Sequence, residues 1–385
     1  MRHFRGLTLF ALIAVPSVVL SAQASPADPA GSGGPHVPRA PASAKAKSEA
    51  KPASGKASMS FQEIWKVIED STRSYTVNED ASGTYADEVW PTAEAPEPAL
   101  WVVKGPVGRR QLRPLEGLSK AAQARLDAAE RAVKSRKFEE AAVEYGAVLK
   151  GRPDHYPTHL LLGDALLSQG KAAEALGRYE QAAQVAPWHH APWFLQASAL
   201  VQLGRFEEAA DRYARALSLR PSLPTLLAAI ESHGNQIGRR VHPPILNPTA
   251  RAYAAGESLV VEADKDGPAW MSHALCKAMW LGEPELRKKR TGKAAHAFSV
   301  HEEAECLAIL IAAHQGTREE YPDPALDRAS QIAADGHLEE LILYEIVSRV
   351  APTSIPVLEE AQQARLHAFV KQYVLIPTAT PAAAR

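Results

Sequence analysis

The sequence has little charge imbalance and lacks any long hydrophobic run after Leu20. Its 43 Lys and Arg nearly balance its 44 Asp and Glu, for a net charge of −1. A protein that binds nucleic acid would show a clear basic excess, so we expect no nucleic-acid partner. A membrane-spanning helix needs about 20 consecutive apolar residues. We therefore expect no stable membrane span in the mature chain.

Motifs that carry catalysis or bind metal are also missing. The segment His301–Glu305 begins like the helical zinc-protease motif, but Glu305 stands where that motif needs a second histidine. There is no phosphate-binding glycine loop and no Ser nucleophile elbow. His273 and Cys276 are spaced to meet on a helix as a base and a nucleophile, although an incidental histidine beside a structural cysteine is favoured. We expect no metal, no cofactor and no catalysis; an enzyme of unknown reaction, with its site in the C-terminal helical half, is the alternative.

Only two cysteines are present, Cys276 and Cys306. In an oxidising compartment an even pair is typical of one disulfide. A bridge closing this 30-residue loop would stabilise the fold by roughly 3–4 kcal/mol. Two buried free thiols on separate helices are the alternative, because the sequence does not show whether the two Cβ atoms approach each other.

The N-terminus has the pattern of a cleavable secretory signal. Arg2 and Arg5 precede an uncharged stretch, Leu7–Leu20, and Ala22 and Ala24 are small residues where a signal peptidase needs them. We expect a signal peptide over residues 1–24, with a retained membrane anchor as the alternative. Residues 25–58 are rich in Ala, Pro, Ser and Lys and are expected to be a disordered tether. The predicted location is the periplasm or cell envelope, after secretion across the inner membrane.

The composition and hydrophobic spacing of the remaining chain change at several points. Phe61, Ile64, Trp65 and Ile68 recur at helical spacing, and an irregular Pro-rich stretch follows with a short extended candidate at Leu100–Val103. Alanine then becomes abundant. The expected divisions are an N-terminal helix and irregular segment (59–118), a helical array with a cap (119–238), a linker (239–266), a C-terminal helical region (267–376) and a tail (377–385).

Three prolines, Pro153, Pro187 and Pro221, lie 34 residues apart. A fixed period of this length indicates one helix–turn–helix unit that is stacked repeatedly. Other positions agree in the same register, namely Ala141, Ala175 and Ala209; Tyr145, Tyr179 and Tyr213; and Phe138, Ala172 and Phe206.

These positions resemble the tetratricopeptide-repeat (TPR) family over about residues 122–223. The family's small residue in the first helix of each unit matches Ala129, Gly163 and Ala197. The resemblance implies an all-α fold, a TPR-type α-solenoid of about three helix pairs, and Leu223–Ile237 starts a further helix that would cap it. A helical C-terminal half should continue it, either as a degenerate solenoid or as a separate bundle. That half has helix candidates at Ala269–Leu281, Val300–His314, Leu338–Val350 and Ile355–Val374, and the basic run Lys288–Arg290 is expected in a loop.

In TPR proteins the first helices line a concave groove, and the resemblance places that groove here. By register its residues are Glu130 and Val133, then Leu160, Asp164 and Leu167, then Phe194, Ser198 and Val201. The Lys/Asn set with which some TPR proteins hold a peptide carboxylate is missing. The expected function is an exported scaffold that binds a hydrophobic helix or extended segment of a protein partner. The alternatives are a groove filled by the chain's own C-terminal half or N-terminal segment, and a purely structural spacer; the oligomeric state is open.

Overall fold

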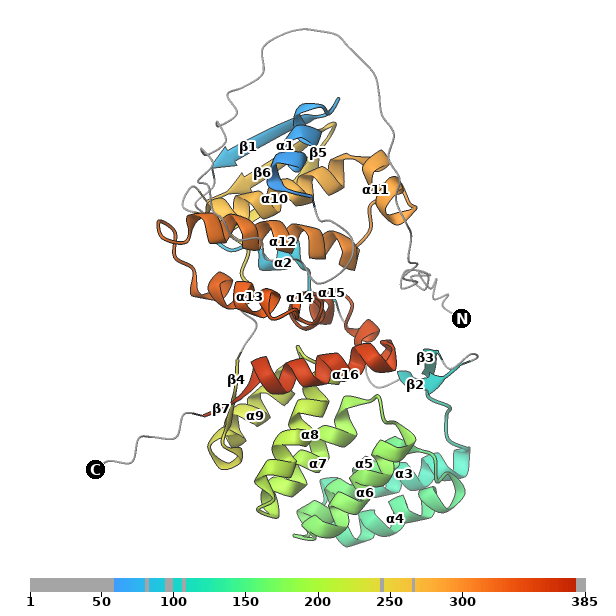
Figure 1. The fold of residues 1–385 in the computed structure, drawn as a ribbon. Helices are drawn as coiled ribbons and strands as arrows, with labels where there is room; N and C mark the ends of the chain where they lie inside the picture. The colour runs from blue at the N-terminus through green and yellow to red at the C-terminus, as the bar shows by residue number, and fades with distance from the viewer. Residues whose placement is uncertain are drawn as a thin grey trace, which may run out of the picture. The chain divides into compact units, whose positions relative to one another are not determined.

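The computed structural model describes residues 59–79, 83–93, 100–105, 109–242, 246–264 and 267–378. The described chain is mostly helical, as predicted, and its strands form three small sheets (Figure 1). The predicted signal peptide, residues 1–24, and the predicted tether, residues 25–58, lie outside the described residues. No helix among the described residues combines the length and the apolar character needed to cross a bilayer.

Seven consecutive helices form the predicted array and lie side by side in Figure 1. Helix α3 packs on α4, α5 on α6 and α7 on α8, and each pair also packs on the next. Helix α9 closes the end of the array against α7 and α8. The expectation of three helix pairs and a cap is thus confirmed. Their bounds are α3 (Lys120–Lys134), α4 (Phe138–Gly151), α5 (Tyr156–Ser168), α6 (Ala172–Val185), α7 (His190–Gln202), α8 (Phe206–Leu219) and α9 (Pro224–Ile237).

The repeated prolines and glycines set the ends of these helices. Each second helix, α4, α6 or α8, ends two residues before its proline, which lacks an N–H donor and clashes with a preceding turn. The turn after the first helix needs a positive φ, which Gly170 and Gly204 adopt at +79° and +72°. Unit one has Arg136 at the same position with a φ of 58°. Because side chains disfavour this region, the first turn is more strained than the other two.

The three repeated tyrosines fill the space between the helices of each unit. Tyr145, Tyr179 and Tyr213 are at most 1% exposed. The backbone of α5 comes so close to the Tyr179 ring that a Cβ placed on Gly163 would lie 2.3 Å from the ring carbon Cε1. Only glycine fits there without a shift of the ring. The small residues predicted for the first helices therefore permit close packing.

Residues 239–264 differ from the linker expected there, because they contain three strands. These are β4 (Arg239–Val241), β5 (Ala250–Ala255) and β6 (Ser258–Ala263). Alternate residues of β6 are buried, which is the period-two pattern of a strand packed on one face. Helix α10 covers β5 and β6. The stretch therefore belongs to the folded core, although its prolines do interrupt the helices.

The N-terminal segment completes this sheet. Strand β1 (Ser74–Glu79) pairs in parallel with β6, which gives the order β1–β6–β5. Trp90 of the segment packs against the chain's own C-terminal half, because it is 1% exposed and its ring lies 6.2 Å from that of Trp270. The other elements of the segment are α1 (Phe61–Glu69), α2 (Ala86–Val89), β2 (Leu100–Lys104) and β3 (Arg110–Pro114).

The C-terminal half contains the four predicted helical stretches and two helices that were not predicted. The basic run Lys288–Arg290 lies in α11 (Pro284–Thr291) and not in a loop, and α13 (Pro324–Ala334) was missed. The end of the chain also differs, because Pro377 belongs to β7 (Leu375–Pro377), which pairs with β4. The remaining elements are α10 (Pro268–Gly282), α12 (Val300–Thr317), α14 (Leu338–Ile342), a π-helix (Leu343–Val347), α15 (Ser348–Val350), a 3₁₀-helix (Pro352–Val357), α16 (Glu360–Phe369) and a π-helix (Val370–Val374).

The C-terminal half meets the array mainly at α8. Gln363 of α16 donates through Nε2 to the carbonyl of Ser218 at 2.7 Å. Lys371 pairs with Asp211 at 2.7 Å. Helix α16 therefore packs on the second helix of unit three, and it does not add a unit in the 34-residue register.

Candidate partner-binding groove

The residues predicted to line the groove come from the first helices α3, α5 and α7. Glu130, Asp164 and Val133 are exposed, the last at 36%. The others are half-buried except Val201, which is only 9% exposed because α9 packs on α7. Val201 therefore offers little surface to a partner. The half-buried residues are Leu160, Leu167, Phe194 and Ser198.

Hydroxyl groups of the repeated tyrosines lie along the floor of the groove. The Tyr179 hydroxyl donates to Asp164 Oδ1 at 2.7 Å. In the next unit the Tyr213 hydroxyl lies 2.6 Å from His233 Nδ1 and 3.5 Å from Ser198 Oγ. These contacts fix the polar side chains of α5 and α7 relative to the second helices.

The early part of the groove carries negative charge. Although Asp164 is exposed at the surface, the neighbouring atoms keep part of the water away from its carboxyl and raise its pKa, and the hydrogen bond from Tyr179 offsets only part of that rise. Burial also raises the pKa of the Tyr145 hydroxyl, with smaller contributions from the negative charges of Glu130 and Asp164. Neither carboxylate forms an ion pair with another described residue. The wall around them is mainly apolar.

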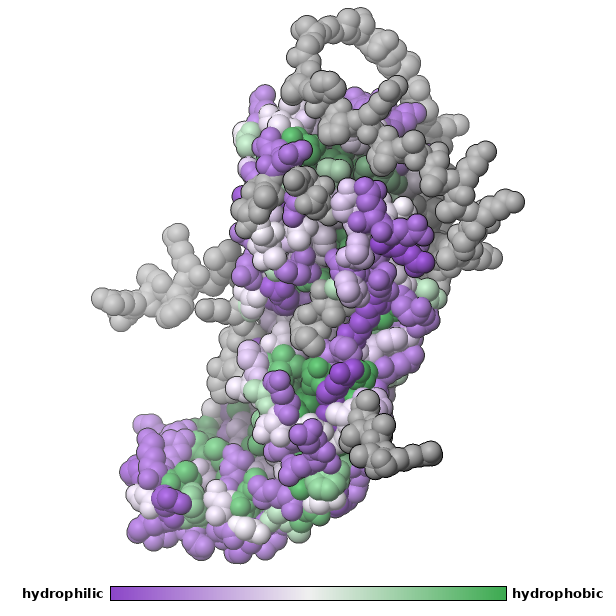
Figure 2. Space-filling view, turned by 90° about the vertical axis from the view of Figure 1, so that its left-hand side faces the viewer, coloured by the Kyte–Doolittle hydropathy of each residue, from purple (hydrophilic) through white to green (hydrophobic). Residues whose placement is uncertain are grey.

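The C-terminal half docks away from this face. Its principal contacts with the array involve α8, a second helix, whereas first helices line the groove. The face drawn in Figure 2 is mostly hydrophilic, with hydrophobic residues gathered in several patches. Isolated exposed apolar side chains such as Val143, which is 70% exposed on α4, are ordinary on a protein surface.

The cysteines and the histidine that the sequence suggested as a disulfide or a catalytic pair lie on α10 and α12. Cys276 and Cys306 form a disulfide with their Cα atoms 5.4 Å apart, so the predicted pair is present. Because the sulfur of Cys276 is bonded, it has no thiolate to act as a nucleophile with His273. Burial lowers the pKa of His273 to about 3, and neither of its ring nitrogens has a hydrogen-bond partner among the described residues.

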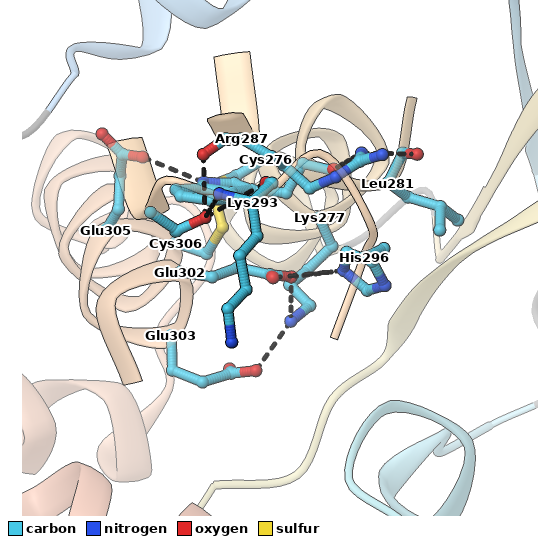
Figure 3. Close-up of polar contacts among 12 residues, drawn as sticks. Cys276, Lys277, Leu281, Arg287, Lys293, His296, Glu302, Glu303, Glu305 and Cys306 are labelled. Atoms are coloured by element: carbon cyan, nitrogen blue, oxygen red, sulfur yellow. Dashed lines mark hydrogen bonds and ion pairs between the residues drawn. A yellow bond between two sulfur atoms is a disulfide. The ribbon is translucent and has the colours of Figure 1, made fainter. Parts of the chain in front are cut away.

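Three acidic side chains of α12 are almost fully buried. Their burial was not predicted from the sequence. Figure 3 shows Glu302 between Lys277 and His296, with N–O distances of 2.5 and 3.1 Å. Lys277 also pairs with Glu303 at 2.7 Å. Although burial opposes ionisation, the positive charge of Lys277 holds the pKa of Glu302 below its usual value.

The same carboxylates anchor the N-terminal segment. Glu303 accepts a hydrogen bond from Trp90 Nε1 at 3.1 Å, and Glu305 accepts one from the backbone N–H of Met59 at 3.0 Å. Glu305 also pairs with Arg290 at 2.7 Å. No group of at least three His, Cys, Asp or Glu that could hold a metal ion occurs among the described residues. These partners indicate that the buried glutamates have a structural role. The only signal of this in the sequence was the group of acids in His301–Glu305, at the start of an apolar helix.

Comparisons with known proteins identify the repeats of the array. A tetratricopeptide-repeat family model matches residues 126–192 and 160–224. This part of the chain is a TPR segment, and it forms an α-solenoid. No curated protein matches the chain.

Among solved structures, the first TPR of Spaghetti (RPAP3) bound to an HSP90 peptide is 19% identical, covers 31% of this chain and 94% of its own, and has a TM-score of 0.29. The MamA protein is 14% identical, with 59% and 97% coverage and a TM-score of 0.29. Naa15/Naa10 bound to HypK-THB is 16% identical, with 65% and 34% coverage and a TM-score of 0.27.

Proposed function

We propose that the protein is a scaffold that binds a segment of another protein in the groove formed by α3, α5 and α7. The observation that carries this proposal is the TPR segment with a partly accessible, mainly apolar first-helix face, because the main contacts of the C-terminal half with the array lie on α8. Stacked repeats bury their own cores and leave such a face for a ligand. We propose no catalytic role, since Cys276, the candidate nucleophile beside His273, is bonded to Cys306 in the disulfide.

Crosslinking in the native envelope, followed by affinity capture, tests the groove. Leu160→Glu and Phe194→Glu each place a charge on the apolar wall, where burial against a partner would leave that charge unpaired. The matched control is Val143→Glu, which makes the same kind of change on the exposed outer side of α4. Both groove variants should lose specific partners that wild type and the control retain. An unchanged set of partners in folded groove variants would refute the proposal.

We also propose that the protein is exported to the periplasm or cell envelope. The charged, apolar and small-residue pattern of residues 1–24 supports export, and so does the Cys276–Cys306 disulfide, because disulfides persist in oxidising compartments. Mass measurement on the protein isolated from the envelope fraction, without reduction, should show a chain that begins at Ser25 with no free thiol. A chain that keeps residues 1–24 and resides in the cytosol would contradict export.

A further inference from the structure

The acidic end of the groove has the features of a subsite for a cation. Glu130 on α3 and Asp164 on α5 occupy the same position in consecutive units. Both are exposed, and neither is neutralised by a basic side chain of the described chain. A positive charge that lies near this end of the array is attracted by both carboxylates.

The charges of both carboxylates act on a third group, the hydroxyl of Tyr145. Tyr145 of α4 is 1% exposed, and no hydrogen bond joins its hydroxyl to another described residue. In the next unit the equivalent hydroxyl, that of Tyr179, donates to Asp164. By the same register the hydroxyl of Tyr145 points to the position of Glu130, and both carboxylates raise its pKa. The Tyr145 side chain is thus almost fully buried, and its hydroxyl is left without a hydrogen-bond partner among the described residues.

The surroundings limit which cation fits. Leu160 and Leu167 of α5 and Val133 of α3 flank the acids with apolar surface that is partly accessible. A free metal ion would gain nothing from this apolar wall and would need more oxygen ligands than the site offers. A lysine or arginine side chain has both an apolar stem and a cationic head with several donors.

Resting on the proposed function, we propose that Glu130, Asp164 and Tyr145 form a cation subsite that receives a lysine or arginine side chain from an otherwise apolar segment of the partner protein. Asp164 Oδ1 already accepts from Tyr179, which holds the carboxylate in place and leaves its other oxygen for the ligand. Glu130 and the Tyr145 hydroxyl supply the remaining acceptors. The subsite sets the register of the segment, because the following unit has the neutral Ser198 in place of the acid.

A display library of random dodecapeptides, selected on the purified full chain, tests this inference. Wild type should enrich peptides with a Lys or Arg beside apolar residues. The double variant Glu130→Gln, Asp164→Asn should keep the apolar preference and lose the basic one. The matched control is Glu139→Gln, Glu174→Gln, which removes two exposed acids from the second helices α4 and α6. The control should select as wild type does.

One selected peptide is then made with arginine and with citrulline, which keeps the shape of arginine without its charge. Loss of the charge should weaken binding to wild type by about tenfold, the effect of a charge-assisted pair at a partly accessible site. The Gln/Asn variant should bind both peptides equally. Equal binding of both peptides by wild type, or the same basic enrichment with both proteins, would overturn the inference.

The same selection separates failure of the subsite from failure of the groove. If Leu160→Glu selects the same peptides as wild type, or if wild type selects none, the groove does not bind peptides, and the proposed function fails together with the subsite. If selection depends on the groove but shows no basic preference, only the subsite fails.

Discussion

Replacement of Gly163 by alanine tests how tightly the array is packed. The added Cβ would lie 2.3 Å from Tyr179 Cε1 and 2.8 Å from Cδ1, closer than atoms tolerate. The ring cannot move away freely, because it is completely buried and its hydroxyl is held by Asp164. Overpacking of this kind costs about 1–3 kcal/mol.

Alanine also favours the helix, since a helix-interior glycine is less stable than alanine by roughly 0.5–1 kcal/mol. The two effects oppose each other and leave a net loss of about 0–2.5 kcal/mol. Gly146 and Gly177 are matched controls, because a Cβ at either position meets nothing within 4 Å. Alanine there should stabilise the protein by about 0.5–1 kcal/mol.

Urea unfolding followed by circular dichroism would measure these differences in the free energy of unfolding. Gly163→Ala should lie about 1–3 kcal/mol below the two controls. If it were as stable as Gly177→Ala, the close contact between α5 and α6 would be wrong. Combining it with Tyr179→Leu should cost less than the sum of the single changes, since the ring is the source of the clash.

Three further predictions concern the C-terminal half. Lys277→Met leaves two buried glutamates without their cation and should destabilise the protein by about 3–5 kcal/mol in urea unfolding, whereas Lys371→Met removes an exposed pair and should cost about 0–1 kcal/mol; similar losses would refute the buried network. Replacing Cys276 and Cys306 by serine should lower the free energy of unfolding by roughly 3–4 kcal/mol, and no change would contradict the bridge. Because burial lowers the pKa of His273 to about 3, the unfolded chain binds a proton more readily, and stability should fall as the pH drops below 6.5. His273→Phe should flatten that part of the pH–stability curve, and an unaltered curve would exclude this histidine as the cause.

The array could be predicted well from the sequence, because the residues that end its helices and mark its buried faces are local signals that recur in every unit. Pro153, Pro187 and Pro221 mark where the second helices end, and the tyrosines mark which face is buried. The same register placed the groove residues on the first helices. It did not show that α9 would cover Val201, because α9 follows the third unit without repeating its pattern.

The pairing of β1 with β6 was not predictable from local patterns. Ser74 pairs with Ser258, far along the chain, and neither strand reveals its partner. The burial of Glu302 and Glu303 was missed for a related reason. A glutamate is normally exposed, and the lysine that offsets its burial lies on a different helix, 25 and 26 residues away. Sequence patterns indicate which segments are helical, but not which charges meet between them.

The principal contacts of the C-terminal half with the array lie at α8, in the third unit. The first two units contribute little to holding the C-terminal half in place. Because repeats pack mainly on their neighbours, duplication or exchange of these units would lengthen or alter the groove while the packing on α8 stayed the same. We therefore expect relatives that prefer different ligands to differ in sequence mainly between Lys120 and Val185.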